Sequence, residues 1–511
     1  MSLLTISHKR DQASVKAVIV GAGIAGLAIA IMMQLADMEF EILERSTGDE
    51  PPMGSAVTLG PPVLRLLDQM GLLPQIERAS KPVVGLTIID GEGKRLGRVD
   101  GVEEDRYGYP IRAIAHHALH RILLDRVPKA NLHRGKLVVE TLQNPNGVSC
   151  KCSDGSTYYG DIIIGADGPS SLTRERMFKQ LKDQGKLPDS DMEASCYEHL
   201  CIGGITNPLD QRDYPTAHDD TSEFQVIYTK EVPYTFWYMP VAENRVAWGI
   251  CNIIPPKFKY HPYSHAFSLS DPSQTPELFA PGSNRPFPAG SVPVRPQLLS
   301  PPISRSPSQT KILDDWFVSS TMNLEAQFKE VMDSRCLMGS GLVRDFLANT
   351  PPKTISVLEL EDRMCKTWYS GRIVLIGEAA HQHLVIGGQG AVQSMLDGVC
   401  LVNLLYDMEY NTPNELTKAF KKYQSKRSGV VKTSMDETSQ VDKVFHGQGF
   451  KAGLMRKFMF NNAWSFNMGN DKFNNNRPQL SFLPFVEDRG SSKANRQKIS
   501  SRLSGNRTFV N

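Results

Sequence analysis

The sequence contains no long uninterrupted run of apolar residues. Its longest apolar stretches, such as residues 18–33, are interrupted by glycines, whereas a membrane-crossing helix needs about 18 or more consecutive apolar residues. The first 16 residues, MSLLTISHKRDQASVK, also lack the apolar core of a secretory signal peptide. These absences predict a protein without a membrane span and with a cytoplasmic location.

Strong charge of one sign and metal-ligand spacing are missing as well. The formal net charge is +2 across 511 residues, and no basic stripe alternates with aromatic residues, so nucleic acid is not an expected partner. Only Cys150 and Cys152 of the eight cysteines lie close together, and a single CxC pair is not a zinc signature. We therefore predict free thiols in a reducing compartment and no metal site.

Three glycine-containing motifs are present, and each follows a short apolar run rich in β-branched residues. They are GAGIAG at 21–26, GADG at 165–168 and GEAAH at 377–381. Open α/β sheets bind ligands at the carboxyl ends of their strands, so motifs in these positions predict one shared nucleotide site. The chain is therefore expected to be an α/β protein with a Rossmann-like dinucleotide-binding domain.

The first motif has the spacing of a dinucleotide-binding turn. Gly21 permits the tight turn, Gly23 lets the backbone approach a pyrophosphate, and Gly26 allows the helix to pack on its strand. The helix N-terminus then offers free N–H groups to the phosphates. Glu44 follows 18 residues after Gly26, at the end of the next predicted strand, where its carboxylate can accept hydrogen bonds from a ribose. The alternative is a glycine-rich turn followed by an incidental acid.

The second motif places Asp167 and Gly168 after a buried strand and before Ser170, Ser171 and Arg174. A strand that ends in Asp-Gly is by itself more often an ordinary turn. Its position after the dinucleotide-binding unit, together with the Ser-Ser-x-x-Arg that follows, favours a cofactor contact instead.

The third motif continues into a second glycine turn and a helix. Glu378 is predicted to hold the ribityl chain of a flavin, while Gly388 and Gly390 bring backbone amides against the pyrimidine edge of the ring. The dipole of the following helix would favour the negative charge that develops there on reduction. For His381 we prefer a helix-packing role, because the sequence offers it no metal partner and no nucleophile.

In this combination the motifs resemble those of the class A flavoprotein monooxygenases, the single-component hydroxylases related to para-hydroxybenzoate hydroxylase and salicylate hydroxylase. The resemblance covers about residues 15–185 and 354–407 and is strongest to fungal FAD-dependent monooxygenases, which the segment 477–490 also resembles. It implies FAD as the cofactor and NAD(P)H as a transient co-substrate, and the lack of a second GxGxxG agrees with such transient binding. Besides the glycines already named, the cofactor residues that it implies are Glu44, Gly54, Val57, Thr58, Arg112, Asp167, Gly168, Glu378 and Ala391.

Three positions depart from the family pattern. Glu378 stands where the family has aspartate, Val385 stands where it has proline, and Pro61-Pro62 replaces a Pro-Asn pair. The longer Glu378 side chain keeps its charge, so binding of the cofactor is expected to survive. Loss of the proline would relax the backbone beside the reactive edge of the flavin, which leaves a relative with altered or no turnover as an alternative.

The resemblance and the composition together divide the chain into four parts. Thirteen of the 33 prolines lie between residues 255 and 307, which predicts a poorly ordered surface insertion at about 255–310. The expected parts are a discontinuous FAD-binding domain (14–85, 105–188 and 354–410), an interleaved antiparallel-sheet substrate domain (86–104 and 189–353), C-terminal helices (411–470) and a mobile tail (471–511).

The function that the resemblance implies is monooxygenation of a small organic molecule. NAD(P)H would reduce FAD, O2 would form a flavin C4a-hydroperoxide, and an aromatic or polyketide- or terpenoid-like substrate would be hydroxylated or epoxidised. The rivals are another flavin oxidoreductase on the same fold and a flavin-binding protein without turnover. The Trp-x-Trp-x-Ile-Pro segment of a halogenase is not found.

Residues that contact the substrate are sought in the aromatic strands of the second domain. The candidates are Tyr228, Trp237, Tyr238 and Trp248. Each of these side chains could equally be an ordinary core aromatic. The sequence predicts no individual catalytic residue and no oligomeric state.

Overall fold

The structure is a computed structural model that describes residues 15–48, 55–101, 103–193, 199–228, 234–253, 297–298, 333–339, 341–351, 354–384, 388–446 and 473–504. Gly54, Val385 and nearly all of the proline-rich insertion lie outside these described residues. Among the described helices, none is long and apolar enough to cross a lipid bilayer.

A six-stranded, mainly parallel sheet forms the centre of the nucleotide-binding part. Its strand order is β19 (Tyr369–Ser370), β20 (Ile373–Leu375), β11 (Ile162–Gly165), β1 (Ala17–Val20), β2 (Phe40–Glu44) and β7 (Leu132–Arg134). Only β19, at one edge, runs antiparallel to its neighbour. All residues of β1 and β11 are buried, as expected for parallel strands covered on both faces.

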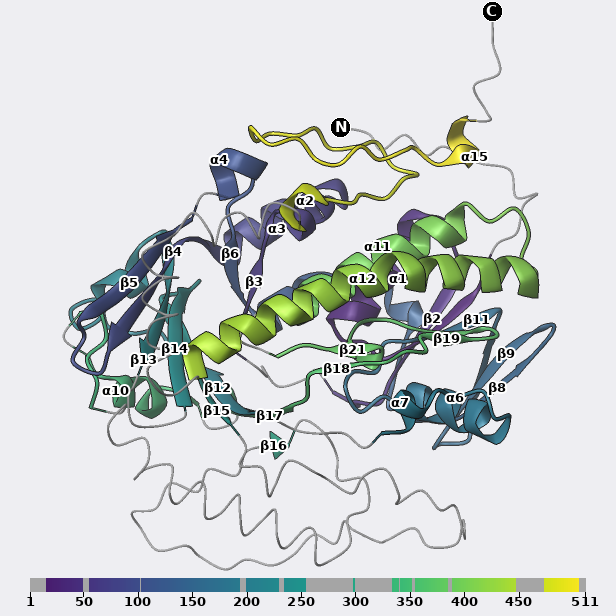
Figure 1. The fold of residues 1–511 in the computed structure, drawn as a ribbon, viewed down its shortest axis with the longest axis horizontal. Coiled ribbons are helices and arrows are strands. Elements are labelled where there is room, and N and C mark those ends of the chain that lie inside the picture. Colours follow the sequence, from purple (N-terminus) through teal and green to yellow (C-terminus); the bar gives the residue numbers. More distant parts are fainter. Residues whose placement is uncertain are drawn as a thin grey trace, which may run out of the picture.

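Helices and a small sheet cover the two faces of this central sheet (Figure 1). On one side, α1 (Ile24–Leu35) packs against α5 (His116–Leu124) and α11 (Gly390–Tyr406). On the other side lie α6 (Leu172–Asp183) and a three-stranded sheet of β8 (Val138–Asn144), β9 (Gly147–Cys152) and β10 (Thr157–Gly160). The glycine turn of the first motif joins β1 to α1, so the predicted βαβ unit is confirmed.

A ten-stranded, mostly antiparallel sheet forms the second part. Its order is β16 (Gln297–Leu298), β17 (Ser356–Leu360), β12 (His199–Ile205), β15 (Arg245–Ile253), β14 (Tyr234–Val241), β13 (Ser222–Tyr228), β4 (Ser80–Asp90), β6 (Arg112–Ala115) and β3 (Ala56–Leu59), with β5 (Arg95–Asp100) paired to β4. The shorter elements are α2 (Pro61–Gln69), α3 (Leu73–Arg78), α4 (Glu103–Tyr107), α7 (Asp189–Met192), α10 (Val343–Ala348), β18 (Arg363–Met364), β21 (His381–Gln382) and α15 (Ser501–Ser504).

The two faces of the large sheet carry different cores, because neighbouring residues of a strand point to opposite faces. One core gathers Phe236, Tyr238 and Trp248 against Phe346 of α10. The other gathers apolar side chains such as Trp237 together with residues of β6 and with Leu384, which follows the third motif. The expected α/β fold with an interleaved antiparallel sheet is thereby confirmed.

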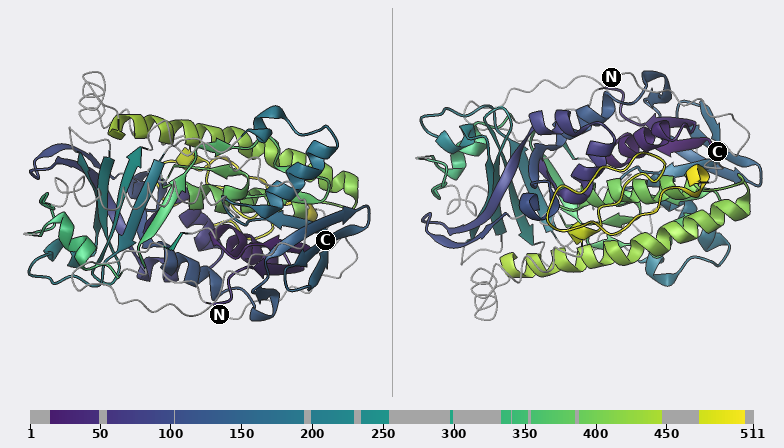
Figure 2. Two further views of the ribbon diagram at one scale, coloured as in Figure 1. Left: turned by 90° about the horizontal axis from the view of Figure 1, so that it is seen from below. Right: turned by 90° about the horizontal axis from the view of Figure 1, so that it is seen from above.

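The long helix α12 (Pro413–His446) connects the two parts. Figures 1 and 2 show it running from the nucleotide-binding sheet to the large sheet. Near one end, the Tyr423 hydroxyl donates to the Leu375 carbonyl over 3.1 Å. Near the other, Asp442 lies 3.1 Å from the His199 ring of β12. This helix occupies the region in which C-terminal helices are predicted.

The C-terminal segment 473–504 differs from the mobile tail that its polar composition predicts. It lies over α2 and α3, where the yellow ribbon of Figures 1 and 2 runs. Leu480 is fully buried in the main core, and Gln69 exchanges two hydrogen bonds with the Leu480 backbone. An ion pair of 2.9 Å joins Arg65 to Asp488. Side-chain amides of Gln69, Asn403 and Gln479 therefore pair with the irregular backbone of this segment, and the expectation of a mobile tail is corrected for these residues.

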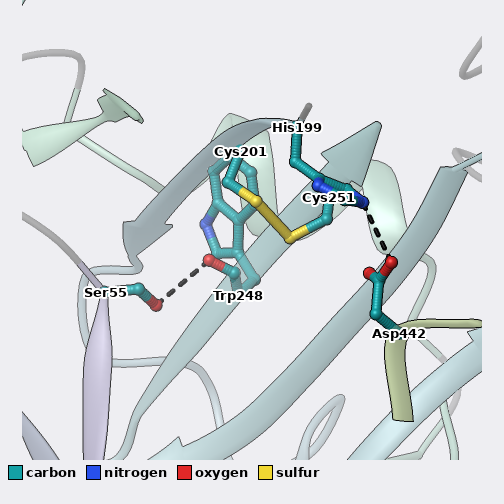
Figure 3. Close-up of a disulfide and its surroundings, with 6 residues drawn as sticks. All are labelled: Ser55, His199, Cys201, Trp248, Cys251 and Asp442. Atoms are coloured by element: carbon teal, nitrogen blue, oxygen red, sulfur yellow. Dashed lines mark hydrogen bonds and ion pairs between the residues drawn. A yellow bond between two sulfur atoms is a disulfide. The ribbon is translucent and has the colours of Figure 1, made fainter. Parts of the chain in front are cut away.

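A disulfide corrects the expectation that the cysteines are free thiols. Cys201 of β12 and Cys251 of β15 are bonded, and their Cα atoms lie 4.3 Å apart (Figure 3). The two residues stand directly opposite each other in the antiparallel register. They are 50 residues apart in the chain, so nothing in their spacing reveals the pair before that register is known. The other described cysteines, Cys150, Cys152, Cys336, Cys365 and Cys400, are free.

Candidate functional site

The glycine turn between β1 and α1 is built as a close-approach site. A Cβ atom on Gly21 would lie 2.5 Å from the Ala166 carbonyl oxygen, and one on Gly26 would lie 1.9 Å from the Gly21 oxygen. A Cβ on Gly23, in contrast, would meet no protein atom within 4 Å. Gly23 is also the N-cap of α1 and offers no side-chain cap, so the helix N-terminus faces open space with free N–H groups.

Glu44 is held by the backbone beside this turn. Its carboxylate accepts hydrogen bonds from the Ala22 amide at 2.7 Å and the Ser46 amide at 2.8 Å, and 8% of the residue is exposed. A carboxylate has about four lone-pair positions, so ribose hydroxyls can still donate to it. His120 of α5 contacts the same turn, with its Nε2 atom 2.8 Å from the Ala22 oxygen. No pattern in the sequence predicts this contact of His120.

Asp167 of the second motif supports the first turn of α6, whose N-cap residue is Ser171. Its carboxylate accepts hydrogen bonds from the Ser171 hydroxyl at 2.6 Å and from the Thr173 amide and hydroxyl, both at 3.0 Å. Gly168 adopts a φ of +77°, and a Cβ there would also meet no protein atom within 4 Å. The Arg174 guanidinium donates to the Ala379 carbonyl over 3.1 Å. The second motif is thereby joined directly to the third.

The third motif rests on a buried ionic network that sequence reasoning missed. Asp397 of α11 accepts a hydrogen bond from the Gly377 amide at 2.9 Å and lies 2.7 Å from the His381 ring. Arg427 of α12 donates to the other Asp397 oxygen over 2.7 Å and to the Gln393 side chain over 2.6 Å. Gln393 and Asp397 are one helical turn apart, which is the only sequence signal for this network.

The electrostatics of the network keep Asp397 ionised. Burial alone would raise the pKa of its carboxyl group, but the neighbouring His381 and Arg427 outweigh that cost and hold the pKa well below its usual range. His381 also packs against the Trp368 ring, with 5.2 Å between the ring centres. A helix-packing role for His381 is consistent with these contacts, and the ring also anchors the loop that carries Glu378.

Glu378 projects from this loop toward the start of α11. A Cβ on Gly390 would lie 3.6 Å from Glu378 Oε1, and a Cβ on Gly388 would lie 2.7 Å from the Thr58 hydroxyl. The Glu378 side chain is reached by solvent, yet the surrounding protein raises the pKa of its carboxyl group by desolvation, opposed by His381. The structure therefore brings Glu378, Thr58, Gly388 and Gly390 together.

The remaining predicted cofactor residues that the structure describes are Val57, Ala391 and Arg112, and their contacts in the structure are with other protein groups. Val57 and Ala391 are partly buried against the main core. The Arg112 guanidinium donates to the Ser80 hydroxyl at 2.7 Å and to the Glu77 carbonyl at 3.0 Å. These bonds give Arg112 a structural role at the corner between α3 and β4, and its contact with a cofactor stays a prediction.

The four aromatic candidates divide between the faces of the large sheet. Tyr238 accepts a hydrogen bond from the Leu337 amide at 2.9 Å, and Trp248 donates to the Thr350 hydroxyl over 2.8 Å. Both side chains therefore have hydrogen-bond partners within the core that contains Phe346. Trp237 lies on the opposite face, packed across Gly249, whose Cβ would come within 2.5 Å of the indole. Tyr228 is partly buried on that same face.

The arrangement fits an extended flavin dinucleotide. A Cβ on Gly23 or Gly168 would meet no protein atom within 4 Å, so a ligand can approach the backbone at both positions. The N-terminus of α1 would lie beside the pyrophosphate, and Glu44 retains lone pairs for a ribose. Glu378 and the amides around Gly390 would face the flavin end. No group of three or more metal-ligating side chains is present in the described part of the chain.

Comparison with known proteins agrees with this geometry. The model of a family described as FAD binding domain matches residues 14–195 and 321–438. The FAD-dependent monooxygenase atmM of Aspergillus flavus is 24% identical over 463 residues, covering 88% of this chain and 82% of the relative. The FAD-dependent monooxygenase ctvC of Aspergillus terreus is 23% identical over 486 residues, covering 93% and 89%.

A solved structure shares the fold. Klebsiella pneumoniae HpxO, crystallised with FAD and uric acid, aligns with a TM-score of 0.58 at 18% identity, covering 90% of this chain and 95% of HpxO. The three motifs, the shared fold and the family match agree on one cofactor, FAD. The chain therefore belongs to the FAD-binding domain family, and it is an FAD-dependent monooxygenase.

Proposed function

We propose that this monooxygenase uses NAD(P)H and O2 to hydroxylate or epoxidise a small organic substrate, by the C4a-hydroperoxide route that the sequence resemblance implies. The substrate would be an aromatic or a polyketide- or terpenoid-like molecule. Fungal relatives that carry the name FAD-dependent monooxygenase support the reaction type. When bound, FAD would supply the redox chemistry, and the protein would supply binding, orientation and exclusion of water.

One observation carries this proposal. The three motifs lie at the carboxyl ends of β1, β11 and β20, which are consecutive parallel neighbours in the central sheet. Ligands of open α/β sheets bind at that edge. One extended dinucleotide can therefore contact all three motifs. Three turns without a common ligand would not be expected to lie together at the carboxyl ends of neighbouring strands.

Different residues of the chain would bind different parts of the cofactor. The N-terminus of α1 would bind the pyrophosphate, and Glu44 would accept hydrogen bonds from the ribose. Glu378 would bind the ribityl chain, and the N-terminus of α11 would stabilise negative charge at the ring. Trp237 and Tyr228 would line the substrate side, because they share a sheet face with Leu384.

A flavin-binding protein with impaired turnover is the second candidate. Two departures from the family pattern favour it, namely Glu378 in place of aspartate and Val385 in place of proline. Substrate panels separate the two candidates. The proposed enzyme should oxidise NADPH or NADH faster with an accepted substrate and form an oxygenated product, whereas a binder should hold FAD and do neither.

A further inference from the structure

A cleft lies apart from the three motifs, where the nucleotide-binding part meets the large sheet. Its volume is about 320 Å³, and it opens between α3, α5 and the hairpin that joins β14 to β15. No residue of the three glycine motifs lines it. A volume near 300 Å³ is the lower end for small-molecule sites, so the cleft can hold part of a ligand but not a whole dinucleotide.

Two arginines give the cleft a positive charge. Arg78, at the end of α3, is exposed, and no described residue forms an ion pair or hydrogen bond with its guanidinium. Arg245, at the start of β15, has its Nε atom 3.2 Å from a Glu243 oxygen, and no described residue accepts a hydrogen bond from its terminal nitrogens. Two cations against one carboxylate leave a net positive charge in the cleft.

Neutral polar groups in the cleft also lack partners. The Gln75 side-chain oxygen is buried without a hydrogen bond. Burial, and then the neighbouring Arg245, lower the pKa of His117, so its ring is neutral near pH 7. The rest of the wall is apolar and consists of four alanines with Ile122 and Val241. The cleft therefore offers cations for an oxyanion, an acceptor for a donor group, and a smooth apolar surface.

Together these features point to a phosphorylated nucleoside. Guanidinium groups match the geometry of phosphate and bind it through paired hydrogen bonds. A base or ribose would pack on the alanines, and an amino or hydroxyl group would satisfy the Gln75 oxygen. We propose that the cleft binds the 2′-phosphoadenosine end of NADPH, with its 2′-phosphate on Arg78 and Arg245. This inference rests on the proposed use of NAD(P)H, and it makes NADPH the preferred co-substrate, because NADH lacks that phosphate.

Calorimetric titration of the FAD-loaded, full-length protein tests the cleft without turnover. The probes are 2′,5′-ADP, which carries the 2′-phosphate, and 5′-AMP, which does not. We expect 2′,5′-ADP to bind at least about 10-fold more tightly, and Arg78→Ala and Arg245→Ala each to raise its Kd about 10-fold. Arg126→Ala is the matched control, since Arg126 is an exposed arginine just beyond α5 and outside the cleft.

Kinetics provide the second readout. Arg78→Ala should raise the KM for NADPH about 10-fold and leave kcat and the KM for NADH unchanged. Equal affinity for the two probes, or no effect of either cleft substitution, would overturn the assignment. Arginine-dependent binding of benzoate without binding of 2′,5′-ADP would overturn it too. Arginine-dependent binding of 2′,5′-ADP by a protein that never oxidises NADPH would support the cleft and refute the proposed reaction.

Discussion

Glu44 and Asp397 are both buried carboxylates, but different groups compensate their charges. Two backbone amides hold Glu44, whereas His381, Arg427 and the Gly377 amide surround Asp397. When neutral backbone amides are the only partners of a carboxylate, its negative charge is not compensated, so it can still attract the hydroxyl groups of a ligand. A carboxylate paired with a cation contributes to the architecture instead. The two residues should therefore respond differently to substitution.

Glu44→Ala should weaken FAD binding by about 1.5–3 kcal/mol, because it removes charge-assisted hydrogen bonds to the ribose and frees the Ala22 amide. The expected readout is a higher Kd in a titration of the flavin-free protein with FAD. Glu39→Ala is the control, since Glu39 is exposed just before the same strand. Equal FAD affinity in the Glu44 variant and the parent would place the ribose elsewhere.

Asp397→Asn should reduce both stability and FAD binding. Removing one partner of a buried ion pair costs about 3–5 kcal/mol, because Arg427 is left uncompensated. The Gly377 loop would also lose its anchor, so urea unfolding and FAD titration should both show the effect. If the substitution lowers stability but leaves the Kd for FAD unchanged, the network supports the fold without positioning Glu378.

The same residue gives a pH prediction. Asp397 has a lowered pKa in the folded protein, so its contribution is fully present above the unfolded pKa of about 3.9 and declines as the pH falls through the folded pKa. The difference in unfolding free energy between the parent and Asp397→Asn should therefore be constant at neutral pH and shrink below about pH 4. A difference that grows on acidification would contradict the ionised state.

At the scale of elements, the C-terminal segment acts as a strap over α2. It has almost no regular secondary structure, yet Leu480 and Phe482 enter the main core and Gln69 pairs with the backbone. A polar composition argues for disorder only when the backbone has no better partner than water. Here side-chain amides supply that partner, which no periodicity in the sequence reveals.

Leu480→Ala should destabilise the protein by about 2–5 kcal/mol, the usual cost of truncating a buried leucine. Ile499→Ala, in the same segment but 54% exposed, is the control and should change stability little. Thermal unfolding monitored by circular dichroism compares them. Equal melting temperatures for Leu480→Ala and the parent would mean that the strap is detached in solution.

The disulfide between β12 and β15 also links two elements of the fold. Replacing both Cys201 and Cys251 by serine should cost about 2–4 kcal/mol, because the bond closes a long loop of the unfolded chain. Thiol titration of the denatured protein, before and after reduction, should differ by two groups. Eight thiols without any reductant would restore the original expectation of free cysteines.

For the whole molecule, the sequence predicted the parts whose signal is local. The steric limits of a tight turn and the requirements of phosphate binding determine these local patterns. The structure places the strands before each glycine motif, the turn at Gly21 and the acid at Glu44 where the sequence predicts them. Contacts set by tertiary packing could not be predicted. Asp397 meets Arg427 only because α11 packs on α12, and Trp237 shares a core with Leu384 only because the large sheet packs against the segment that follows the third motif.

Three motifs from distant segments of the chain form a single FAD site. The absorption spectrum of the purified protein tests this site after incubation with FAD and removal of free flavin. The bound FAD is then released by denaturation and quantified. We predict a yellow protein with one non-covalently bound FAD per chain. A protein that is folded by circular dichroism but colourless under these conditions would show that the three motifs do not form an FAD site.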